Sequence, residues 1–436
     1  MNRRQRFEPS GPLRGEYVPP PDKSISHRAA LFGAMSDEPV TVRNYLDSAD
    51  TRSTLDALLT VGAGVQEDGD RLLIRGVGLH EALEATGGQL DVGNSGTLLR
   101  LLPGWLAGQR GGVWTLDGDA SIRRRPVDRV VEPLALMGAD VEAREGRYPP
   151  LTVRGAELSG VEYQVPVASA QVKSCVLIAG MLAAGSTTLT ERRQSRDHTE
   201  RMLRRARVPF ERDGLRMTVS QVDELELDEV VVPGDPSSAA FVVAAATLVP
   251  RSRVVVRDVA LNWTRAGFFE VAKRMGAVIV GDLEPRGTLA DQEPVGELDV
   301  RAGPLEGTEV APDEVPLAID ELTLVALLGA FADGETVVRE AAELRVKESD
   351  RIAGVVEGLR GLGADIEEAP DGFMVRGDGS PLRGGVLDAR GDHRLAMLGA
   401  VAGLASREGV EVVGMDAAAV SYPEFDRDLA TLLDGS

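Results

Sequence analysis

Six stretches of the chain are rich in apolar and small residues and have the length of a helix. They are HRAALFGAM from residue 27, TLLRLLPGWLAG from 97, QVKSCVLIAGMLAAG from 171, SAAFVVAAATL from 238, ELTLVALLGAFADG from 321 and HRLAMLGAVAGLA from 393. Each predicts a helix of small apolar residues, and QVKSCVLIAGMLAAG places Cys175 in a buried helix.

The segments between these helices repeat one order of elements. A β-rich strand follows each apolar helix, as in PVTVRN, GVWTLDG, GSTTLTE, RSRVVVRD, GETVVRE and GVEVVGM. A second predicted helix then ends in a Gly-Ala turn, at Gly62-Ala63, Gly138-Ala139, Gly276-Ala277 and Gly363-Ala364. Alternating segments after these turns, such as ADVEAR and ADIEEA, predict further strands. The pattern predicts six copies of one α/β repeat, of which copies three and six are the least regular.

The length of the repeat and the turn-rich segments indicate two lobes. Successive apolar helices begin about 65–85 residues apart, far more than the roughly 20–50 residues of a solenoid repeat. Each copy has a sheet face and two helices and needs neighbours to bury them. The turn-rich segments at 18–23 and 231–238, which contain Pro and Gly, are typical of the points where a chain crosses between domains. We predict an upper lobe over 22–235 and a lower lobe over 236–436 that also includes 1–21.

Composition and charge exclude several classes of protein. Apolar residues make up 43% and charged residues 27% of the 436, which is typical of soluble globular proteins. The net charge of −21 argues against nucleic-acid and anionic-membrane binding, both of which need a basic surface. A local group of cations can still bind a small anion against this average.

Cysteine and histidine usage predicts no metal site. The single cysteine excludes a disulfide framework and a cysteine-based zinc site, and the four histidines show no paired spacing such as HExxH. The first dozen residues lack the apolar core of a signal peptide, and the longest apolar stretches are shorter than the roughly 20 residues that a bilayer requires. We expect a soluble, cytoplasmic protein.

Polar residues precede each apolar helix. The openings read DKSISHR (22–28), NSGT (94–97), ASAQVKS (168–174), DPSS (235–238), IDE (319–321) and GDHR (391–394). Asp, Asn and Ser are favoured N-caps, so each opening taken alone is explained by capping, including Asp320 in IDE. Most openings also carry Lys, Arg, His or Gln, which capping does not require. Because helix N-termini favour phosphate and carboxylate groups, a shared anion site is the alternative.

The run LRVKESDRI at 344–352 has five charged residues of both signs. In a helix, Lys347 and Arg351 share a face, and Glu348 lies three residues from Arg351. Surface ion pairs of this kind contribute under about 1 kcal/mol each, so a solvated helix face explains the run as well as a binding site does. Motifs for ATP, dinucleotide and serine-hydrolase sites (GxxxxGK[ST], GxGxxG after a strand, GxSxG) are missing from the sequence.

Six motifs together resemble one enzyme family over essentially the whole chain. DKSISHRA, GNSGTLLR, RRRPVDR, ASAQVKS, LRVKESDR and GDHRLAM, in this order, resemble the 5-enolpyruvylshikimate-3-phosphate (EPSP) synthases. The resemblance implies an α/β (α+β) fold, a two-lobed inverse α/β barrel-like arrangement of six βαβαββ-type units, three per lobe, with the active site in the cleft between the lobes. It also implies transfer of the enolpyruvyl group of phosphoenolpyruvate to the 5-hydroxyl of shikimate 3-phosphate, with release of phosphate.

The resemblance also implies roles for single residues. Asp320 matches the general base, Glu348 the residue that handles protons at the methylene carbon, and Lys23 a catalytic contact to both substrates. Binding of shikimate 3-phosphate is implied for Lys23, Ser24, Arg28, Ser169, Ala170, Gln171, Ser195, Asp320 and Lys347. Binding of phosphoenolpyruvate is implied for Lys23, Gly96, Arg125, Gln171, Arg351 and Arg394.

These residue types suit the implied reaction. Both substrates are phosphorylated carboxylates, which arginine binds with two parallel hydrogen bonds. Addition and elimination through a tetrahedral intermediate need a base at the hydroxyl and an acid at the methylene carbon. No metal or organic cofactor is required, and the expected partners are the two small-molecule substrates of a monomer, with glyphosate as a possible inhibitor.

The chain departs from many relatives at three positions. Val420 stands where many carry a lysine before Ser421-Tyr422-Pro423, Ser95 replaces an alanine beside Gly96, and His198 replaces a tyrosine of some members. The sequences SAQVK (169–173), RDHTE (196–200) and NWTR (262–265) resemble a subgroup often tolerant of glyphosate, which makes tolerance a hypothesis for this chain.

Two other interpretations stay open at this point. The UDP-N-acetylglucosamine enolpyruvyltransferases have a similar fold and chemistry but usually carry a cysteine in a mobile loop, and the corresponding stretch here, 117–126, has none. A symmetric repeat protein can also be a non-catalytic scaffold, although that interpretation gives no reason for cations and carboxylates at helix starts in both halves.

Overall fold

All six apolar stretches form helices in the computed structural model of the chain, which describes residues 3–84 and 89–435. Nearly every residue of these inner helices is buried, because small and apolar side chains extend all round them. They are α1 (Lys23–Met35), α3 (Gly96–Leu106), α5 (Ala170–Leu182), α7 (Pro236–Leu248), α10 (Leu322–Phe331) and α12 (His393–Ala405). The prediction of six small-residue apolar helices is confirmed, and Cys175 is buried in α5.

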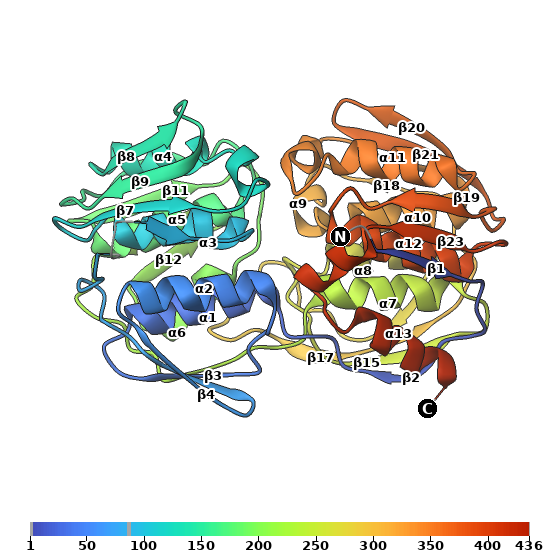
Figure 1. Cartoon of the computed structure of the whole chain (residues 1–436), viewed down its shortest axis with the longest axis horizontal. Coiled ribbons are helices and arrows are strands. Elements are labelled where there is room, and N and C mark those ends of the chain that lie inside the picture. The colour runs from blue at the N-terminus through green and yellow to red at the C-terminus, as the bar shows by residue number, and fades with distance from the viewer. Residues whose placement is uncertain (1–2, 85–88, 436) are drawn as a thin grey trace. The chain divides into compact units, whose positions relative to one another are not determined.

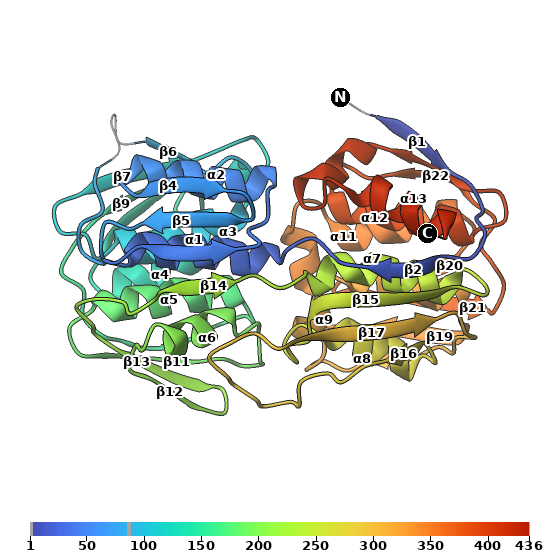
Figure 2. The same cartoon turned by 90° about the horizontal axis from the view of Figure 1, so that it is seen from below.

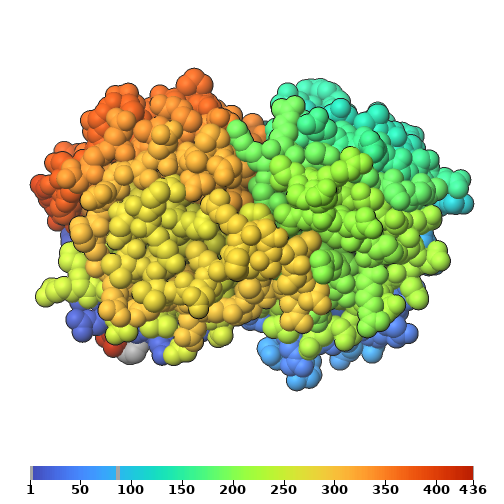
Figure 3. Space-filling model, turned by 180° about the vertical axis from the view of Figure 1, so that it is seen from behind, coloured from blue at the N-terminus to red at the C-terminus, as the bar shows by residue number. Residues whose placement is uncertain are grey.

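A second set of helices keeps exposed residues on its outer side. These are α2 (Ala49–Thr60), α4 (Asp128–Leu136), α6 (His198–Arg205), α8 (Gly267–Arg274), α11 (Arg351–Gly361) and α13 (Phe425–Asp434). The yellow part of Figure 3, which includes α8, lies at the surface of the face shown there. The shorter helical pieces are α9 (Val315–Ala318) and the 3₁₀ helices η1 (Ile122–Arg124), η2 (Ala342–Val346) and η3 (Met415–Val420).

The described strands form six separate sheets, five of four strands and one of three. Three sheets contain β3 (Val40–Arg43), β4 (Gly64–Asp68), β5 (Arg71–Arg75), β6 (Gln89–Asp91), β7 (Val113–Asp117), β8 (Asp140–Arg144), β9 (Tyr148–Arg154), β10 (Glu162–Gln164), β11 (Ser186–Thr190), β12 (Phe210–Asp213), β13 (Arg216–Ser220) and β14 (Glu229–Val231). The other three contain β1 (Arg4–Phe7), β2 (Arg14–Tyr17), β15 (Arg253–Ala260), β16 (Val278–Val280), β17 (Val295–Arg301), β18 (Glu309–Val310), β19 (Asp333–Val338), β20 (Asp365–Ala369), β21 (Gly372–Asp378), β22 (Gly385–Asp388) and β23 (Val410–Val413).

One repeat explains the five four-stranded sheets, whereas the three-stranded sheet of the sixth repeat has β1 in place of a hairpin. In the fifth repeat, β18 leads through α10 to the parallel strand β19, and α11 then leads to the hairpin β20–β21. The second hairpin strand, β21, lies between β19 and β20, which gives the order β18-β19-β21-β20. The sheets β6-β7-β9-β8 and β10-β11-β13-β12 follow the same rule. The predicted βαβαββ order is confirmed.

Three repeats borrow a strand from a distant part of the chain. The first takes β14, which pairs in parallel with β3. The fourth takes β2, which pairs in parallel with β15, and Figure 2 shows the two strands side by side. The sixth takes β1, which pairs antiparallel with β23. The N-terminal segment therefore completes two sheets built mainly from the second half of the chain.

The chain separates into two compact units, each described here by itself (Figure 1). Unit 1 comprises Met1–Pro20, Gly234–Arg286 and Pro294–Ser436, and unit 2 comprises Pro21–Pro233 and Gly287–Glu293. Residues 287–293 fall within the range predicted for the lower lobe, but their contacts are with unit 2. Residues 1–2, 85–88 and 436, which the sequence analysis also assigned to lobes, lie outside the described residues.

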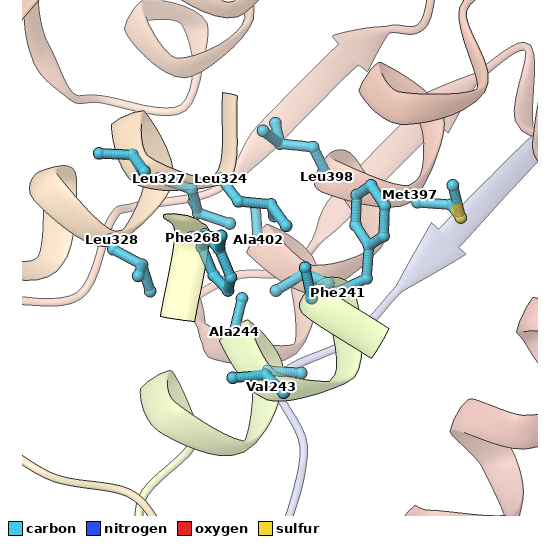
Figure 4. Packing of buried hydrophobic residues seen from close by; sticks show 14 of the residues in the cluster. Phe241, Val243, Ala244, Phe268, Leu324, Leu327, Leu328, Met397, Leu398 and Ala402 are labelled. Carbon is cyan, nitrogen blue, oxygen red and sulfur yellow. The ribbon is translucent and has the colours of Figure 1, made fainter. Parts of the chain in front are cut away.

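Each unit has its own hydrophobic core. Figure 4 shows the core of unit 1, where Phe241 of α7, Leu324 of α10 and Leu398 of α12 converge. In unit 2, α3 and α5 approach so closely that a Cβ on Gly104 would lie 2.3 Å from the carbonyl oxygen of Cys175. Because the inner helices lie side by side, their N-terminal residues are brought near one another within each unit.

The predicted Gly-Ala turns close the second helix of four repeats. Gly62, Gly138, Gly276 and Gly363 adopt φ angles of +102°, +100°, +103° and +100°, a region that residues with a Cβ rarely enter. The third repeat has Arg207 with φ of +56° at the comparable point, which agrees with its less regular sequence.

Candidate active site

The first helix start of unit 2 carries Lys23 and Ser24. Asp22 caps α1 by accepting a hydrogen bond of 2.8 Å from the backbone of Ile25. Lys23, the first helical residue, forms an ion pair with Asp50, whose carboxylate is nearly buried. The lysine side chain keeps 21% exposure, so a charged group remains available at this helix start.

Arg28 lies one turn further along α1 and is buried. Its Nε donates to Thr199 (2.8 Å), its Nη2 to Ser174 (2.8 Å), and its Nη1 to the carbonyl of Ser24 (2.9 Å). Burial lowers the pKa of Arg28 to about 10, although Glu200 and Asp22 act in the opposite direction. The guanidinium therefore stays protonated at neutral pH while its partners are all uncharged oxygen atoms.

Gly96, at the second helix start, makes room for Arg125. Ser95 caps α3 through the backbone of Leu98 (3.2 Å). A Cβ on Gly96 would lie 2.4 Å from Nη1 of Arg125, well inside van der Waals contact. The guanidinium also donates to the side-chain oxygen of Asn94 at 2.9 Å. Glycine at 96 is thus required for the observed position of this arginine.

Gln171 connects the second and third helix starts of unit 2. Its side-chain oxygen accepts from Arg100 (2.8 Å) and its nitrogen donates to Thr97 (3.1 Å), both on α3. Ser169 caps α5 through the backbone of Val172 (3.4 Å), and the carbonyl of Ala170 accepts from Ser174 at 2.6 Å.

Ser195 lies beside a buried ionic cluster. Its hydroxyl donates to Glu191, and Glu191 also pairs with Lys173 at 3.0 Å. Lys173 in turn lies 2.7 Å from Glu200, and the side chains of all three charged residues are fully buried. Burial alone would lower the pKa of Lys173, but the two carboxylates outweigh it and raise the pKa. Burial raises the pKa of Glu200 against the attraction of Lys173.

In unit 1, three cations surround Asp320. The N-cap of α10 is Glu321, and its side chain forms no capping hydrogen bond. The carboxylate of Asp320 instead lies 3.0 Å from Arg351, 3.5 Å from Lys347 and 3.6 Å from Arg394. Capping, the alternative explanation of this aspartate, is therefore wrong.

Arg351 is buried among carboxylates. Its Nε pairs with Asp392 at 2.9 Å, its Nη1 with Asp320 at 3.0 Å and its Nη2 with Glu348 at 2.6 Å. Burial opposes the charge, but Asp392, Glu348 and Asp320 outweigh it and raise the pKa of Arg351. Glu348 thus shares one guanidinium with Asp320, which brings the two predicted proton-transfer residues together.

The run 344–352 is not the continuous helix considered in the sequence analysis. The 3₁₀ helix η2 ends at Val346, Lys347 is extended, and α11 begins only at Arg351, with Asp350 as its N-cap. Arg345 pairs with Asp350 at 2.8 Å, which is a structural contact next to the helix start. Because the chain is not helical at Lys347 and Glu348, Lys347 can approach Asp320 and Glu348 can approach Arg351 without the two residues sharing a helix face with Arg351.

The helix starts of unit 1 are joined by a polar network that sequence reasoning missed. Asp392 caps α12 and also pairs with Arg351. Glu321 accepts from Arg394 (3.2 Å) and from the hydroxyl of Ser237 on α7. Both acids stand in the quoted openings GDHR and IDE, but only their three-dimensional partners separate them from ordinary caps.

The residue positions that depart from many relatives have local structural roles. Nδ1 of His198 donates to the carboxylate of Glu293 across 2.6 Å, and His198 is buried in unit 2. Val420 ends η3, and Tyr422, just after it, bonds to Tyr17 (2.5 Å) and Asp428 (2.8 Å). This element thereby ties the N-terminal segment to α13 within unit 1.

Residues 3–84 and 89–435 contain neither a candidate metal site nor a membrane-spanning helix. No group of three or more His, Cys, Asp or Glu side chains in these ranges is arranged to hold a metal ion. None of the helices in the same ranges has the length and hydropathy needed to cross a membrane.

Comparison with known proteins identifies the family. The model of EPSP synthase (3-phosphoshikimate 1-carboxyvinyltransferase) matches residues 7–429. The chain is 44% identical to the 3-phosphoshikimate 1-carboxyvinyltransferase of Bacillus pumilus, covering 95% of this chain and 96% of that protein. It is 45% identical to the enzyme of the same name from a Synechococcus species, covering 99% and 97%.

Solved structures agree with this result. The EPSP synthase of Acinetobacter baumannii superimposes with a TM-score of 0.86 at 36% identity, covering 99% of this chain and 98% of that one. The enolpyruvyl transferase NikO from Streptomyces tendae has a TM-score of 0.75 at 17% identity, over 98% of this chain and 96% of that one, and shows the fold alone.

The repeated βαβαββ fold is that of the enolpyruvyl transferases, with the inverse α/β barrel architecture predicted from the sequence. The chain belongs to the EPSP synthase family. It is therefore an enzyme, which contradicts the non-catalytic scaffold. The named relatives also favour this family over the UDP-N-acetylglucosamine enolpyruvyltransferases.

Proposed function

We propose that the chain transfers the enolpyruvyl group of phosphoenolpyruvate to the 5-hydroxyl of shikimate 3-phosphate and releases phosphate, in the pathway to chorismate and the aromatic amino acids. The observation that carries this proposal is the arrangement around Asp320, whose carboxylate lies 3.0 Å from Arg351, 3.5 Å from Lys347 and 3.6 Å from Arg394. A carboxylate among cations, with Glu348 on the same arginine, suits proton transfer between anionic substrates.

In the addition step, the oxygen of the 5-hydroxyl forms a bond to C2 of phosphoenolpyruvate. Asp320 takes the hydroxyl proton, and Glu348 supplies a proton to C3, which gives a tetrahedral intermediate. In the elimination step, a proton leaves C3, the bond between C2 and the phosphate oxygen breaks, and phosphate departs. Acid and base exchange roles between the steps, as the chemistry requires.

The arginines of unit 1 fit the phosphoenolpyruvate role. Arg351 and Arg394 present planar forks that match carboxylate and phosphate. Arg351 donates to Asp320 and Glu348, and we propose that phosphoenolpyruvate replaces these carboxylates as the partner of its N–H groups. The exchange leaves both acids free to move protons. Lys347 lies next to Asp320, which is assigned to shikimate 3-phosphate, and we assign Lys347 to the same substrate.

The helix starts of unit 2 fit a phosphorylated carboxylate. Shikimate 3-phosphate is assigned to Lys23, Ser24, Arg28, Ser169, Ala170, Gln171 and Ser195. Phosphoenolpyruvate is assigned to Lys23, Gly96, Arg125 and Gln171. Support comes from the charges at these starts, because helix N-termini favour anions and the cations add to that preference. An active site between the two predicted lobes stays a prediction.

The test is phosphate release measured with both substrates and with each omitted in turn. Release that depends on shikimate 3-phosphate and on phosphoenolpyruvate is the expected result. Release from phosphoenolpyruvate alone contradicts the assignment of the acceptor. Replacing shikimate 3-phosphate with UDP-N-acetylglucosamine tests the related enzyme, and no release is expected with it.

Three further properties stay predictions that the same preparation tests. Sedimentation checks the predicted monomer, and the distribution of the tagged chain in cells checks the cytoplasmic location. Titration of glyphosate against phosphoenolpyruvate checks whether it inhibits at all and whether the tolerance hypothesis holds. Micromolar inhibition competitive with phosphoenolpyruvate would contradict tolerance.

A further inference from the structure

The orientation of Arg28 depends on two hydroxyl groups outside the set assigned to substrates. Thr199, on α6, accepts from Nε at 2.8 Å, and Ser174, on α5, accepts from Nη2 at 2.8 Å. Both side chains are buried, at 1% exposure each, so water does not compete for these contacts. Three helices, α1, α5 and α6, therefore meet at one guanidinium.

The hydrogen-bond directions in this group follow from counting protons. Ser174 has one hydroxyl proton, and it donates that proton to the carbonyl of Ala170 at 2.6 Å. The 2.6 Å contact between the two hydroxyls must then run from Thr199 to Ser174. Arg28 donates to both, so one chain leads from Arg28 through Thr199 and Ser174 to the backbone of Ala170 at the start of α5.

A buried ion pair supports the same contact one residue along each helix. Lys173 precedes Ser174, Glu200 follows Thr199, and their charged groups lie 2.7 Å apart with both side chains fully buried. Breaking such a pair leaves an unpaired buried charge, which is strongly unfavourable. The pair therefore fixes α5 against α6 at the point where the two hydroxyls face Arg28.

This arrangement leaves part of Arg28 available. A guanidinium has five N–H donors, and the contacts of Arg28 with the described residues use three of them, including Nε. Because Nε and Nη2 are both held, the plane of the fork is fixed, and one N–H remains on each of the two Nη atoms. A fixed fork binds an oxyanion with less loss of side-chain freedom than a mobile one.

We propose that Thr199 is a positioning residue for shikimate 3-phosphate: it holds the guanidinium of Arg28, with Ser174, in the orientation that binds this substrate. The inference rests on the proposed function, since it assumes that Arg28 contacts shikimate 3-phosphate. Thr199 touches no substrate in this proposal and acts only through Arg28.

Two substitutions of Thr199 separate the hydroxyl from the packing of the side chain. Thr199→Val keeps the shape and removes the acceptor, whereas Thr199→Ser keeps the hydroxyl and removes the methyl group. Thr188→Val is the matched control, because Thr188 is also a buried threonine of unit 2 in a hydroxyl–hydroxyl contact, here with Thr218 at 2.9 Å. Thermal unfolding of each variant shows whether it is folded.

Steady-state phosphate release is then measured against each substrate. In Thr199→Val we expect the KM for shikimate 3-phosphate to rise about tenfold or more, with kcat and the KM for phosphoenolpyruvate within about twofold. Thr199→Ser and Thr188→Val should keep all three constants within about twofold. An unchanged KM in Thr199→Val overturns the proposal, and so does an equal rise in Thr199→Ser, which indicates packing. If Thr199→Val does not fold, Ser174→Ala takes its place with the same expected direction.

A measurement without substrate distinguishes this proposal from the proposed function. The Nε–H of Arg28 should give a slowly exchanging NMR signal, assigned by its loss in Arg28→Lys, because it is buried and bonded to Thr199. The signal should persist in Thr199→Ser and exchange rapidly in Thr199→Val. Equal exchange in both variants overturns the positioning role. Failure of the wild type to release phosphate contradicts the proposed function alone.

Discussion

Arg28 of unit 2 and Arg351 of unit 1 are both buried arginines assigned to substrates, yet their surroundings are opposite. Arg28 donates to two hydroxyls and a carbonyl, all of them neutral. Arg351 donates to the carboxylates of Asp392, Asp320 and Glu348. The same side chain is thus held by dipoles in one unit and by charges in the other.

The difference shows in the pKa of each guanidinium. Burial lowers the pKa of Arg28 to about 10, because its hydrogen-bond partners are neutral and the nearby carboxylates of Glu200 and Asp22 compensate only in part for the lost hydration. The carboxylates around Arg351 outweigh burial and raise its pKa. Neutral hydrogen-bond partners do not offset the positive charge of a guanidinium, so that charge can attract an anion. Carboxylate partners offset the charge, and the guanidinium then holds the carboxylates in position. The neutral partners of Arg28 therefore suit the proposed binding of an anionic substrate, and the acids around Arg351 suit the proposed proton transfer.

The largest effect is expected for Asp320, one of the carboxylates that surround Arg351. Asp320→Asn removes the proposed base while keeping its size, so kcat should fall about 1000-fold, within the range attributed to general acid–base catalysis. Phosphate release at saturating substrates measures it. Asp350→Asn makes the same change at a helix cap that pairs with Arg345, and it should keep kcat within about threefold. A loss of under tenfold in Asp320→Asn contradicts its role.

The substitution Arg28→Gln tests the arginine whose hydrogen-bond partners are neutral. Loss of a charge-assisted contact to a phosphorylated carboxylate should raise the KM for shikimate 3-phosphate about 100-fold and leave the KM for phosphoenolpyruvate within a few-fold. Arg345→Gln is the control, since that arginine pairs with Asp350 and Glu368 and is assigned no substrate. Equal increases for both substrates would show that Arg28 does not distinguish them.

A smaller effect is expected where a glycine makes room for an arginine. In Gly96→Ala the new Cβ would lie 2.4 Å from Nη1 of Arg125, so the guanidinium must move. We expect the KM for phosphoenolpyruvate to rise about tenfold, at a cost of roughly 1.4 kcal/mol, while the KM for shikimate 3-phosphate stays within about twofold. Gly64→Ala, whose Cβ would have its nearest contact at 3.5 Å, should change neither constant.

The last prediction concerns stability rather than activity, and it tests the burial of His27 next to Lys23 in unit 2. Burial, with Lys23 nearby, lowers the pKa of His27 to about 3, against 6.5 for an ordinary histidine. The unfolded chain therefore takes up a proton near pH 6.5 that the folded chain refuses, and stability falls as pH decreases toward 3.

Urea unfolding at pH 7 and pH 5 measures this loss. The free energy of unfolding should decrease by about 2 kcal/mol more in the wild type than in His27→Gln. His80→Gln, which changes an exposed histidine, should behave as the wild type does. Equal pH dependence in wild type and His27→Gln would show that His27 accepts a proton in the folded chain.

Local sequence patterns predicted the fold better than they predicted the site. The inner helices and the turns at Gly62 and Gly138 depend on neighbouring residues, and they form as expected. The helical spacing considered for 344–352 was wrong, because the chain breaks at Lys347 and turns its charges toward partners distant in sequence.

The acids that hold the site together were also beyond reach of the sequence. Asp50 pairs with Lys23, and Asp392 pairs with Arg351, across 27 and 41 positions of the chain respectively. In sequence, an acid that only caps a helix cannot be distinguished from one such as Asp392, which also pairs with an arginine of another repeat. Asp320 shows the reverse case, since it stands at a helix start but the N-cap there is Glu321.

The borrowed strands also order the events of synthesis. β1 and β2 leave the ribosome before their partners, which are β23, near the C-terminus, and β15. Every strand of the three sheets of unit 2 lies between Val40 and Val231, so these sheets can form while later residues are still being made. The segments of β1 and β2 must instead wait for their partners, and unpaired strand edges are prone to pairing with other chains. During translation, β1 is therefore exposed to such pairing until Val413 emerges.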